Sequence, residues 1–219
     1  MIKGILFDVD GTLILSNDAH AHSWVEAFAH FGYTVKYDDV RPLIGMGSDK
    51  IIPFFFPELQ EDKAKGKEIS QMRGKIFRTK YLPTLSPAPG AYDLVKYFSE
   101  KEIKMVTASS ASEKDMDQLL DTVHVKEFLH TTTSSSDVQN SKPDSDIVRE
   151  ALNKIQLPAD DVLLIGDTPY DIEASEKCGV PVIAVRCGGF PDSTLSGAKQ
   201  IYDDPADVLK NIEEILQSG

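Results

Sequence analysis

Short apolar runs alternate with helical patterns along most of this chain. The runs that predict buried strands are Ile2–Phe7, Ile103–Thr107, Leu129–Thr133, Val162–Ile165 and Val182–Val185. The third run is polar although β-branched, and we predict a strand there mainly because the alternation demands one. Continuous apolar strands alternating with amphipathic helices are typical of a parallel sheet covered on both faces. We therefore predict an α/β fold with a doubly wound parallel sheet.

Apolar residues at helical spacing predict three of the covering helices. They recur through residues 91–98, 147–155 and 208–216. From the second strand onward, these helical patterns alternate with the predicted strands.

The segment from residue 15 to residue 85 interrupts this alternation. It contains no convincing strand, but it has a helical pattern around Trp24 and an aromatic cluster at residues 51–57. A crossover between parallel strands needs only about a dozen residues, so this segment is an insertion with structure of its own. The proline-rich stretch 82–90 reads as the return linker. We predict a core domain made of residues 1–14 and 86–219, and a helical domain at 15–85.

Polar side chains follow four consecutive predicted strands. In chain order they are Asp8 and Asp10, then Thr107 with Ala108, then Lys142, and finally Asp167 with Asp171. Each has a structural explanation of its own: Asp is a favoured helix N-cap, for example, and an acid in a first turn suits the helix dipole. Ligands of open parallel sheets bind beyond the carboxyl ends of the strands. One shared site is therefore the simpler explanation of all four.

The grouped charges point to phosphoryl transfer. Asp8, Asp10 and Asp167 would repel one another in a cleft of low dielectric unless a cation lay among them. Oxygen ligands favour a hard cation, most plausibly Mg²⁺. Lys142, Thr107 and helix N-termini would attract a phosphate. A metal, a carboxylate nucleophile and a phosphate cradle together indicate an aspartyl-phosphate intermediate.

Composition limits the possible binding partners of the protein and its possible cellular compartment. The 219 residues carry a formal net charge of −12, which disfavours binding to nucleic acid or to an anionic membrane. No apolar run approaches the roughly 18 residues that span a bilayer. Two cysteines without CxxC spacing fit a reducing compartment. We expect a cytoplasmic protein, with a monomer favoured, whose partner is a small phosphate ester.

The motifs resemble those of the haloacid dehalogenase superfamily of hydrolases. DVDGT at residues 8–12 matches the first family motif, DxDGT, and GDTPYD at 166–171 matches the fourth, GDxxxD. Thr107 fits the second motif and Lys142 the third, and all four occur in the family's order. The insertion resembles the helical cap of the branch that holds phosphoglycolate phosphatases and β-phosphoglucomutases. The resemblance therefore implies the family's Rossmann-like core with an inserted cap.

The resemblance also implies a role for each matching residue. Asp8 would attack phosphorus, and Asp10 would protonate the leaving oxygen and then activate water. Thr107, Ala108 and Lys142 would hold the phosphoryl group. Asp8, the main-chain carbonyl of Asp10 and Asp167 would ligate Mg²⁺, with Asp171 just behind them. An acid at position 10 also disfavours carbon–halogen and carbon–phosphorus cleavage, because the family members with those activities lack it.

Three positions in the insertion bear on specificity. Leu15 stands where many relatives have Asp, in the hinge to the cap. His20 lies where related caps often have His, so we expect it to bind substrate unless it is simply buried. Ser48 stands where the mutases have a cation that grips a second phosphate, and we expect it near the leaving group unless this loop is only solvated.

We weigh three functions on this sequence. The leading hypothesis is a Mg²⁺-dependent phosphatase for a small phosphorylated metabolite, and the alternative is a β-phosphoglucomutase-like phosphotransferase. A signalling receiver also gathers acids, Thr and Lys around Mg²⁺, but it places two adjacent acids after its first strand and needs no inserted domain. The DxD spacing and the long insertion argue against a receiver.

Overall fold

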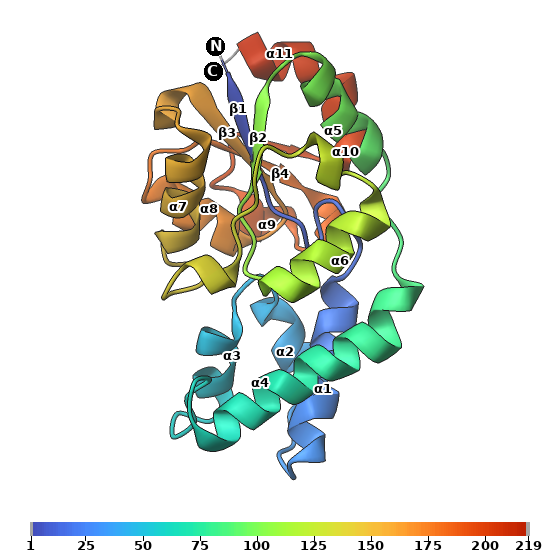
Figure 1. The fold of residues 1–219 in the computed structure, drawn as a ribbon, viewed down its shortest axis with the longest axis vertical. Helices are drawn as coiled ribbons and strands as arrows, with labels where there is room; N and C mark the ends of the chain where they lie inside the picture. The colour runs from blue at the N-terminus through green and yellow to red at the C-terminus, as the bar shows by residue number, and fades with distance from the viewer. Residues whose placement is uncertain (1, 218–219) are drawn as a thin grey trace.

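The sheet is parallel throughout and lies between two layers of helices (Figure 1), in a computed structural model that describes residues 2–217. Its strands are β1 (Gly4–Phe7), β2 (Lys104–Thr107), β3 (Val162–Gly166), β4 (Val182–Val185) and β5 (Gln200–Tyr202). The strand order is β2-β1-β3-β4-β5. The chain leaves β1 toward one side for β2 and continues on the other side with β3. This change of direction puts the switch point, where ligands bind, beside the end of β1.

The helices flank the sheet and form the insertion. Between β1 and β2 they are α1 (Asn17–His30), α2 (Tyr37–Val40), α3 (Ser48–Phe55), α4 (Ala64–Ile76) and α5 (Ala91–Glu100). After β2 they are α6 (Glu113–Val123), α7 (Asp146–Ile155), α8 (Pro169–Glu176), α9 (Asp192–Leu195), α10 (Pro205–Lys210) and α11 (Ile212–Gln217). Short turns of helix join several of them, including η2 (Phe77–Tyr81) and η3 (Leu82–Thr84).

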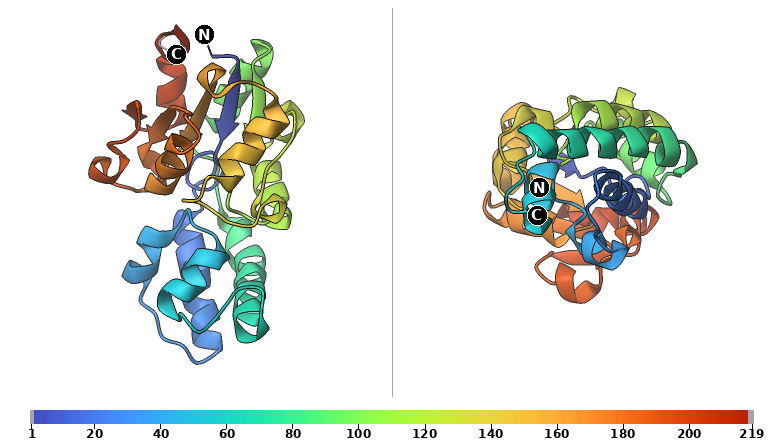
Figure 2. Two further views of the ribbon diagram at one scale, coloured as in Figure 1. Left: turned by 90° about the vertical axis from the view of Figure 1, so that its left-hand side faces the viewer. Right: turned by 90° about the horizontal axis from the view of Figure 1, so that it is seen from below.

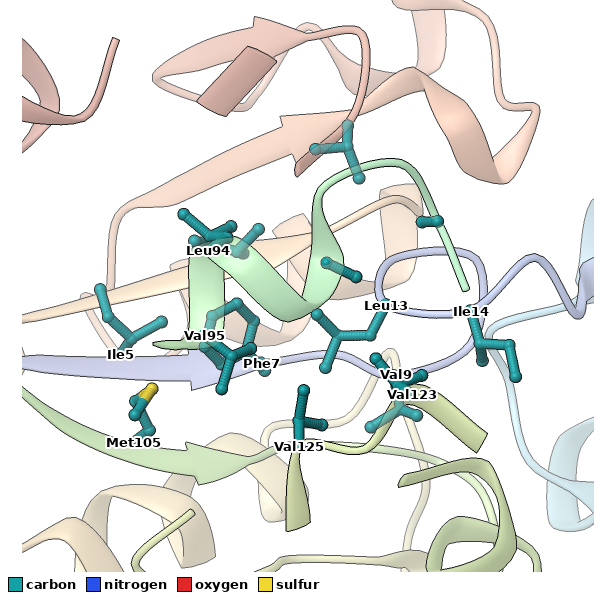
Figure 3. Packing of buried hydrophobic residues seen from close by; sticks show 14 of the residues in the cluster. Ile5, Phe7, Val9, Leu13, Ile14, Leu94, Val95, Met105, Val123 and Val125 are labelled. Carbon is teal, nitrogen blue, oxygen red and sulfur yellow. The ribbon is translucent and has the colours of Figure 1, made fainter. Parts of the chain in front are cut away.

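Alternate residues of each strand serve two separate apolar clusters. Ile5 and Phe7 of β1 point into the cluster covered by α5, α6, α10 and α11, and Figure 3 shows part of this packing. Leu6, between them, points to the other face, where α7 and α8 cover the sheet. The period of two in a strand explains this division. Because both faces are buried, the strands read as continuous apolar runs.

Four of the five predicted strands are present, and the one at Leu129–Thr133 is wrong. Only a single bridge, between Val106 and Thr131, pairs this segment with β2. The Thr107 hydroxyl accepts a hydrogen bond from the Thr133 N–H at 2.8 Å, so a side chain takes the place of a ladder bond. The sequence also failed to reveal β5, because its three half-buried residues form a short edge strand between polar neighbours.

The helical patterns are confirmed, with one difference. Residues 91–98 and 147–155 lie in α5 and α7. The third pattern is divided into α10 and α11 at Asn211, whose side chain donates a hydrogen bond to the Asp207 carbonyl. The apolar face continues across this break, since Val208 and Ile215 are both buried in the same cluster.

The insertion folds into helices α1 to α4 and has an apolar cluster of its own. Trp24, Phe28 and Ile52 are buried in that cluster, and the Trp24 and Phe28 rings lie 5.5 Å apart. Figure 2 shows these helices as a separate lobe beyond the end of the sheet that is remote from the termini. We refer to residues 15–85 as the insertion and to the remainder as the core.

Two chain segments join the insertion to the core, and they lie side by side. The Leu15 N–H donates to the Ser86 carbonyl at 3.1 Å, and the Ala88 N–H donates to the Leu13 carbonyl at 2.9 Å. The adjacent main-chain pairing forms a double-stranded connection. It holds the insertion over the carboxyl ends of the strands.

Within residues 2–217, no helix has both the length and the apolar character needed to cross a membrane.

Leu94 tests the packing of α5 on the sheet. Leu94→Ala should lower the free energy of unfolding by about 2–5 kcal/mol, because the fully buried side chain (Figure 3) would leave a cavity. Urea unfolding followed by circular dichroism measures this loss. Lys96→Ala, at an exposed position of the same helix, should change stability by less than about 0.5 kcal/mol. Equal losses in the two variants would contradict this account of the core.

Candidate active site

Three buried carboxylates meet at the switch point of the sheet. Asp8 follows β1, while Asp167 follows β3 and Asp171 lies in the first turn of α8. Each can offer one oxygen such that the three atoms lie within 4.8 Å of one another. All three side chains are buried. The sequence placed an acidic cluster at this edge, but its members differ: Asp171 lies with Asp8 and Asp167, whereas the Asp10 side chain, which we had grouped with them, is not among the three.

One ammonium group compensates part of this charge. Lys142 Nζ lies 2.7 Å from Asp8 Oδ1 and 2.5 Å from Asp171 Oδ1. The lysine side chain is only 1% exposed. Burial alone would lower the pKa of Lys142, but the Asp171 and Asp8 charges hold that pKa above its ordinary value. Lys142 is therefore a charged partner of the nucleophile candidate, and its expected contact with a phosphoryl group stays a prediction.

Asp171 has a structural role as well. Its Oδ2 accepts hydrogen bonds from the Thr168 N–H at 3.0 Å and from the Thr168 hydroxyl at 2.7 Å. Thr168 in turn caps α8, so the pair forms a capping box. The helix mouth thus fixes Asp171 and, through it, Lys142.

Asp167 is held by polar groups on both of its oxygens. Thr12 Oγ1 donates to Oδ1 at 3.1 Å, and Asn17 Nδ2 donates to Oδ2 at 2.7 Å. Close approach is possible because Gly11 and Gly188 face this carboxylate. A Cβ built on Gly188 would lie 1.8 Å from Asp167 Oδ2, and one on Gly11 would lie 2.3 Å from the same atom. Gly11 also has a φ of +78°, which favours glycine there.

The donor set fits a hard divalent cation. With all three carboxylates ionised and one ammonium group, the cluster carries a net charge of −2. Burial, followed by the Asp171 and Asp10 charges, raises the pKa of Asp8 to about 7 against the opposing effect of Lys142. Burial and the Asp8 and Asp171 charges likewise raise the pKa of Asp167. A cation among these oxygens would remove the repulsion, and an all-oxygen site suits Mg²⁺.

Asp10 faces away from the acidic cluster. Its Oδ1 accepts a hydrogen bond from Ser16 Oγ at 2.5 Å and lies 2.6 Å from His20 Nε2. Burial by itself would raise the pKa of Asp10, but His20 and Ser16 keep that pKa below its ordinary value. His20 also stacks on Phe77, with 4.0 Å between ring centroids. Asp10 is therefore oriented by the insertion, and its side chain is separate from the metal-ligand candidates.

We expected the Thr107 hydroxyl to bind phosphate, but the hydroxyl that lines the cavity belongs to Ser109, two residues later. Thr107 is fully buried and exchanges hydrogen bonds with Thr133, as acceptor at 2.8 Å and as donor at 3.2 Å. The Ala108 N–H is also engaged, since it donates to the Phe7 carbonyl at 2.7 Å. Neither residue lines the cavity above Asp8, whereas Ser109 does. The prediction for Thr107 and Ala108 is corrected in this respect, because they bind the sheet and the segment beside it.

A small cavity separates the core from the insertion above Asp8 and Asp10. Core residues Ser109, Ser110 and Ala111 line it together with the two acids, and the Ser110 hydroxyl is buried without a hydrogen-bond partner. The insertion contributes His20, Trp24, Arg73 and the loop residues 44–46. A substrate bound at Asp8 would therefore face the insertion with its leaving group.

Ser48 does not line this cavity. It lies in a neighbouring one with Asp49, Glu61 and Ser141, and its hydroxyl accepts a hydrogen bond from Ser70 at 3.2 Å. The expectation that Ser48 lies near the leaving group thus does not match the geometry.

Sequence reasoning missed four residues of the site. Ser109 and Ser110 follow Thr107 in a run of small polar residues, and a shift of two positions would have found Ser109. Asn17 and Arg73 carry no comparable signal. They reach the site only through the folding of α1 and α4, since each lies far in sequence from the group that it approaches.

The chain is similar to known proteins over most of its length. Residues 5–185 match the model of a family described as haloacid dehalogenase-like hydrolase. The chain is 24% identical to the phosphoglycolate phosphatase of Rhodospirillum rubrum, covering 93% of this chain and 88% of that protein. It is 24% identical to the pyrophosphatase PpaX of Halalkalibacterium halodurans, covering 98% and 95% respectively. A crystal structure of a hydrolase from Pseudomonas syringae superposes with a TM-score of 0.90 at 24% identity, covering 97% and 99% of the two chains.

Lys142 tests the charge balance of the site. Lys142→Met should lower the free energy of unfolding by about 3–5 kcal/mol in EDTA, because it leaves buried carboxylates without their partner. Mg²⁺ should recover part of that loss by replacing the missing positive charge. Urea unfolding with and without Mg²⁺ measures both effects. Lys177→Met, at an exposed ion pair, should hardly change the free energy of unfolding in either condition. If Lys142→Met lost no more stability than this control, the charge balance would be contradicted.

Proposed function

The chain belongs to the haloacid dehalogenase-like hydrolases, and on this basis we propose a Mg²⁺-dependent phosphatase of small phosphorylated metabolites that works through an aspartyl phosphate. The observation that carries the proposal is the placement of Asp8. It lies at the switch point, beside a buried lysine and two further carboxylates, and it lines the cavity. An isolated structural aspartate would need no such surroundings.

The first half of the reaction uses Asp8 and Asp10. The Asp8 carboxylate attacks phosphorus, which forms an aspartyl phosphate and breaks the bond to the leaving oxygen. Asp10 takes up a proton when the substrate binds, because His20 and Ser16 keep its pKa below the ordinary value in this structure despite its burial, and it gives that proton to the leaving oxygen. In the second half a water gives a proton to Asp10 and attacks the phosphorus, which releases phosphate and restores Asp8. The position of Asp10, next to Asp8 in the cavity but turned toward His20, supports this division of roles.

Other residues of the chain would hold the phosphoryl group. Lys142 reaches Asp8 directly and is charged, so it can neutralise a phosphoryl oxygen as the transfer proceeds. Ser109 and Ser110 border the same cavity, and the free Ser110 hydroxyl is a further donor. These two serines take the place that we first gave to Thr107 and Ala108.

The cation would be held by Asp8 and Asp167, with Asp171 behind them and the Asp10 main-chain carbonyl as a further ligand. When bound, Mg²⁺ supplies charge neutralisation that lets an anionic phosphate approach an anionic nucleophile. Thr12 and Asn17 keep the Asp167 carboxylate oriented for this purpose.

The insertion would act as a mobile cap. The cavity has a volume of only about 30 Å³, which is room for a water or two. A phosphate ester can reach Asp8 only after the insertion moves away from the core. Polar contacts such as Lys50 to Asp144 at 2.6 Å, and Gly47 N–H to Ser141 Oγ at 2.9 Å, close the two parts together. The paired segments around Leu13 and Ala88 form the natural hinge.

The nucleophile assignment predicts the effect of Asp8→Asn. Phosphate release from p-nitrophenyl phosphate should fall by roughly 10³-fold or more, because an amide cannot form the phosphoenzyme. EDTA should abolish the wild-type activity, and added Mg²⁺ should restore it. The control variant Asp117→Asn, at an exposed position of α6, should keep full activity. Undiminished turnover by Asp8→Asn in Mg²⁺ would exclude the mechanism.

A phosphoglucomutase-like phosphotransferase remains the alternative within the same family. Solved structures described as β-phosphoglucomutase, from Clostridium difficile among others, share the fold. In this chain Ser48 stands where the mutases have a cation that grips a second phosphate, and it lies outside the cavity.

We therefore expect hydrolysis and no isomerisation with a hexose 1-phosphate. Phosphorus NMR of the reaction with catalytic hexose bisphosphate should show inorganic phosphate as the only new signal. Accumulation of hexose 6-phosphate would favour the mutase. A phosphatase assay on the same sample controls for inactive protein.

A further inference from the structure

Arg73 brings a positive charge into the cavity from the insertion. It lies on α4, and it is the one Lys or Arg among the described residues that line the cavity containing Asp8 and Asp10. Its guanidinium carbon lies 5.4 Å from the Trp24 ring centroid and 5.6 Å from that of Phe77. Stacking against two rings fixes the planar group in place. In the phosphatase mechanism proposed above, Arg73 has no role.

Asp115, the acidic neighbour of Arg73, balances its positive charge only in part. Arg73 Nη1 lies 3.0 Å from Asp115 Oδ2, on α6 of the core, and Arg78 Nη1 lies 2.6 Å from Asp115 Oδ1. Asp115 is only 2% exposed, so two guanidinium groups share one buried carboxylate. The group of three has a net charge of +1. Its excess positive charge lies at the wall of the cavity, because Arg73 lines the cavity and Arg78 does not.

Arg73 also keeps an unused donor. Its Nε is buried and has no hydrogen-bond partner in the structure. A buried donor without a partner is costly, and such groups are usually satisfied in some state of the protein.

These observations point to the leaving-group end of the substrate. Core groups surround the place where phosphorus would lie, and Arg73 enters from the opposite wall with Trp24. We propose that Arg73 is a specificity residue that binds a second anionic group, a carboxylate or a phosphoryl group, on the leaving group of a small phosphate ester. Asp115 and Arg78 position it by bridging the insertion to the core. This inference rests on the proposed function for the orientation of the substrate.

Matched pairs of probes test the inference. One pair is the phosphate ester of 3-hydroxypropanoate and that of 3-hydroxypropanamide; the other is ethylene glycol bisphosphate and 2-hydroxyethyl phosphate. The members of a pair differ only in the second anion. The wild type should favour the anionic member by about 10- to 100-fold in kcat/KM, because a charge-assisted hydrogen bond is lost with the neutral one. The pair with the larger preference identifies the anion.

Arg73→Gln should remove this preference, because it lowers kcat/KM for the anionic members far more than for the neutral members. Asp115→Asn is the matched control, because it breaks the same bridge between insertion and core but leaves both arginines. Because Asp115 positions Arg73, Asp115→Asn should reduce the preference, but by much less than Arg73→Gln, since the Arg73 guanidinium group itself remains. If thermal unfolding shows that Asp115→Asn does not fold, Arg78→Gln replaces it, and its preference should fall much less than that of Arg73→Gln.

Other outcomes would overturn the inference. Equal losses for anionic and neutral members in Arg73→Gln would make Arg73 a bridge or a ligand of the transferred phosphate. The inference would also be overturned if a control variant lost the preference as completely as Arg73→Gln.

Binding measurements distinguish a failure of this inference from a failure of the proposed function. Calorimetric titration of the four probes into Asp8→Asn, with and without Arg73→Gln, measures affinity without turnover. A failure of all probes to react in the wild type would contradict the phosphatase proposal alone, provided the anionic members still bind more tightly through Arg73. Equal affinities within each pair would overturn the inference even if the phosphatase proposal holds.

Discussion

The structure around the active site depends on one electrostatic constraint, the burial of three carboxylates around a single ammonium group. Asp8, Asp167 and Asp171 are each buried, and Lys142 reaches two of them. Ionised groups at this depth are costly unless they are paired. The fold meets the constraint with a helix cap at Asp171, with Thr12 and Asn17 at Asp167, and with the lysine itself. The remaining negative charge is what makes the site suitable for a cation and then for a phosphate.

The same constraint connects the core to the insertion. Asn17, the first residue of α1, donates to the Asp167 carboxylate and to the Gly188 carbonyl. Asp10 likewise belongs to the core but is oriented by Ser16 and His20 at the start of the insertion. A movement of α1 would therefore change the surroundings of Asp10, the proposed general acid, and of Asp167, a metal-ligand candidate, together.

Charge is distributed unequally between the two walls of the cavity. The core wall holds the acids with Lys142 behind them, and the insertion wall holds Arg73, whose acidic partner Asp115 is shared with Arg78. An ester with an anion at each end would match both walls.

The sequence by itself determined the class of fold and the acidic centre. Apolar runs such as those of β1 and β3 can be recognised because both faces of the sheet are buried. Asp8 and Asp167 can be recognised because each directly follows such a strand, and Lys142 because it shortly precedes the helical pattern of α7. Only the tertiary structure decided the rest. It moved the cavity hydroxyl from Thr107 to Ser109, because Thr107 binds Thr133, a contact between residues 26 positions apart. It likewise brought Arg73 to Asp115 and Asn17 to Asp167, since such long-range contacts depend on how helices pack and leave no periodic pattern in the chain.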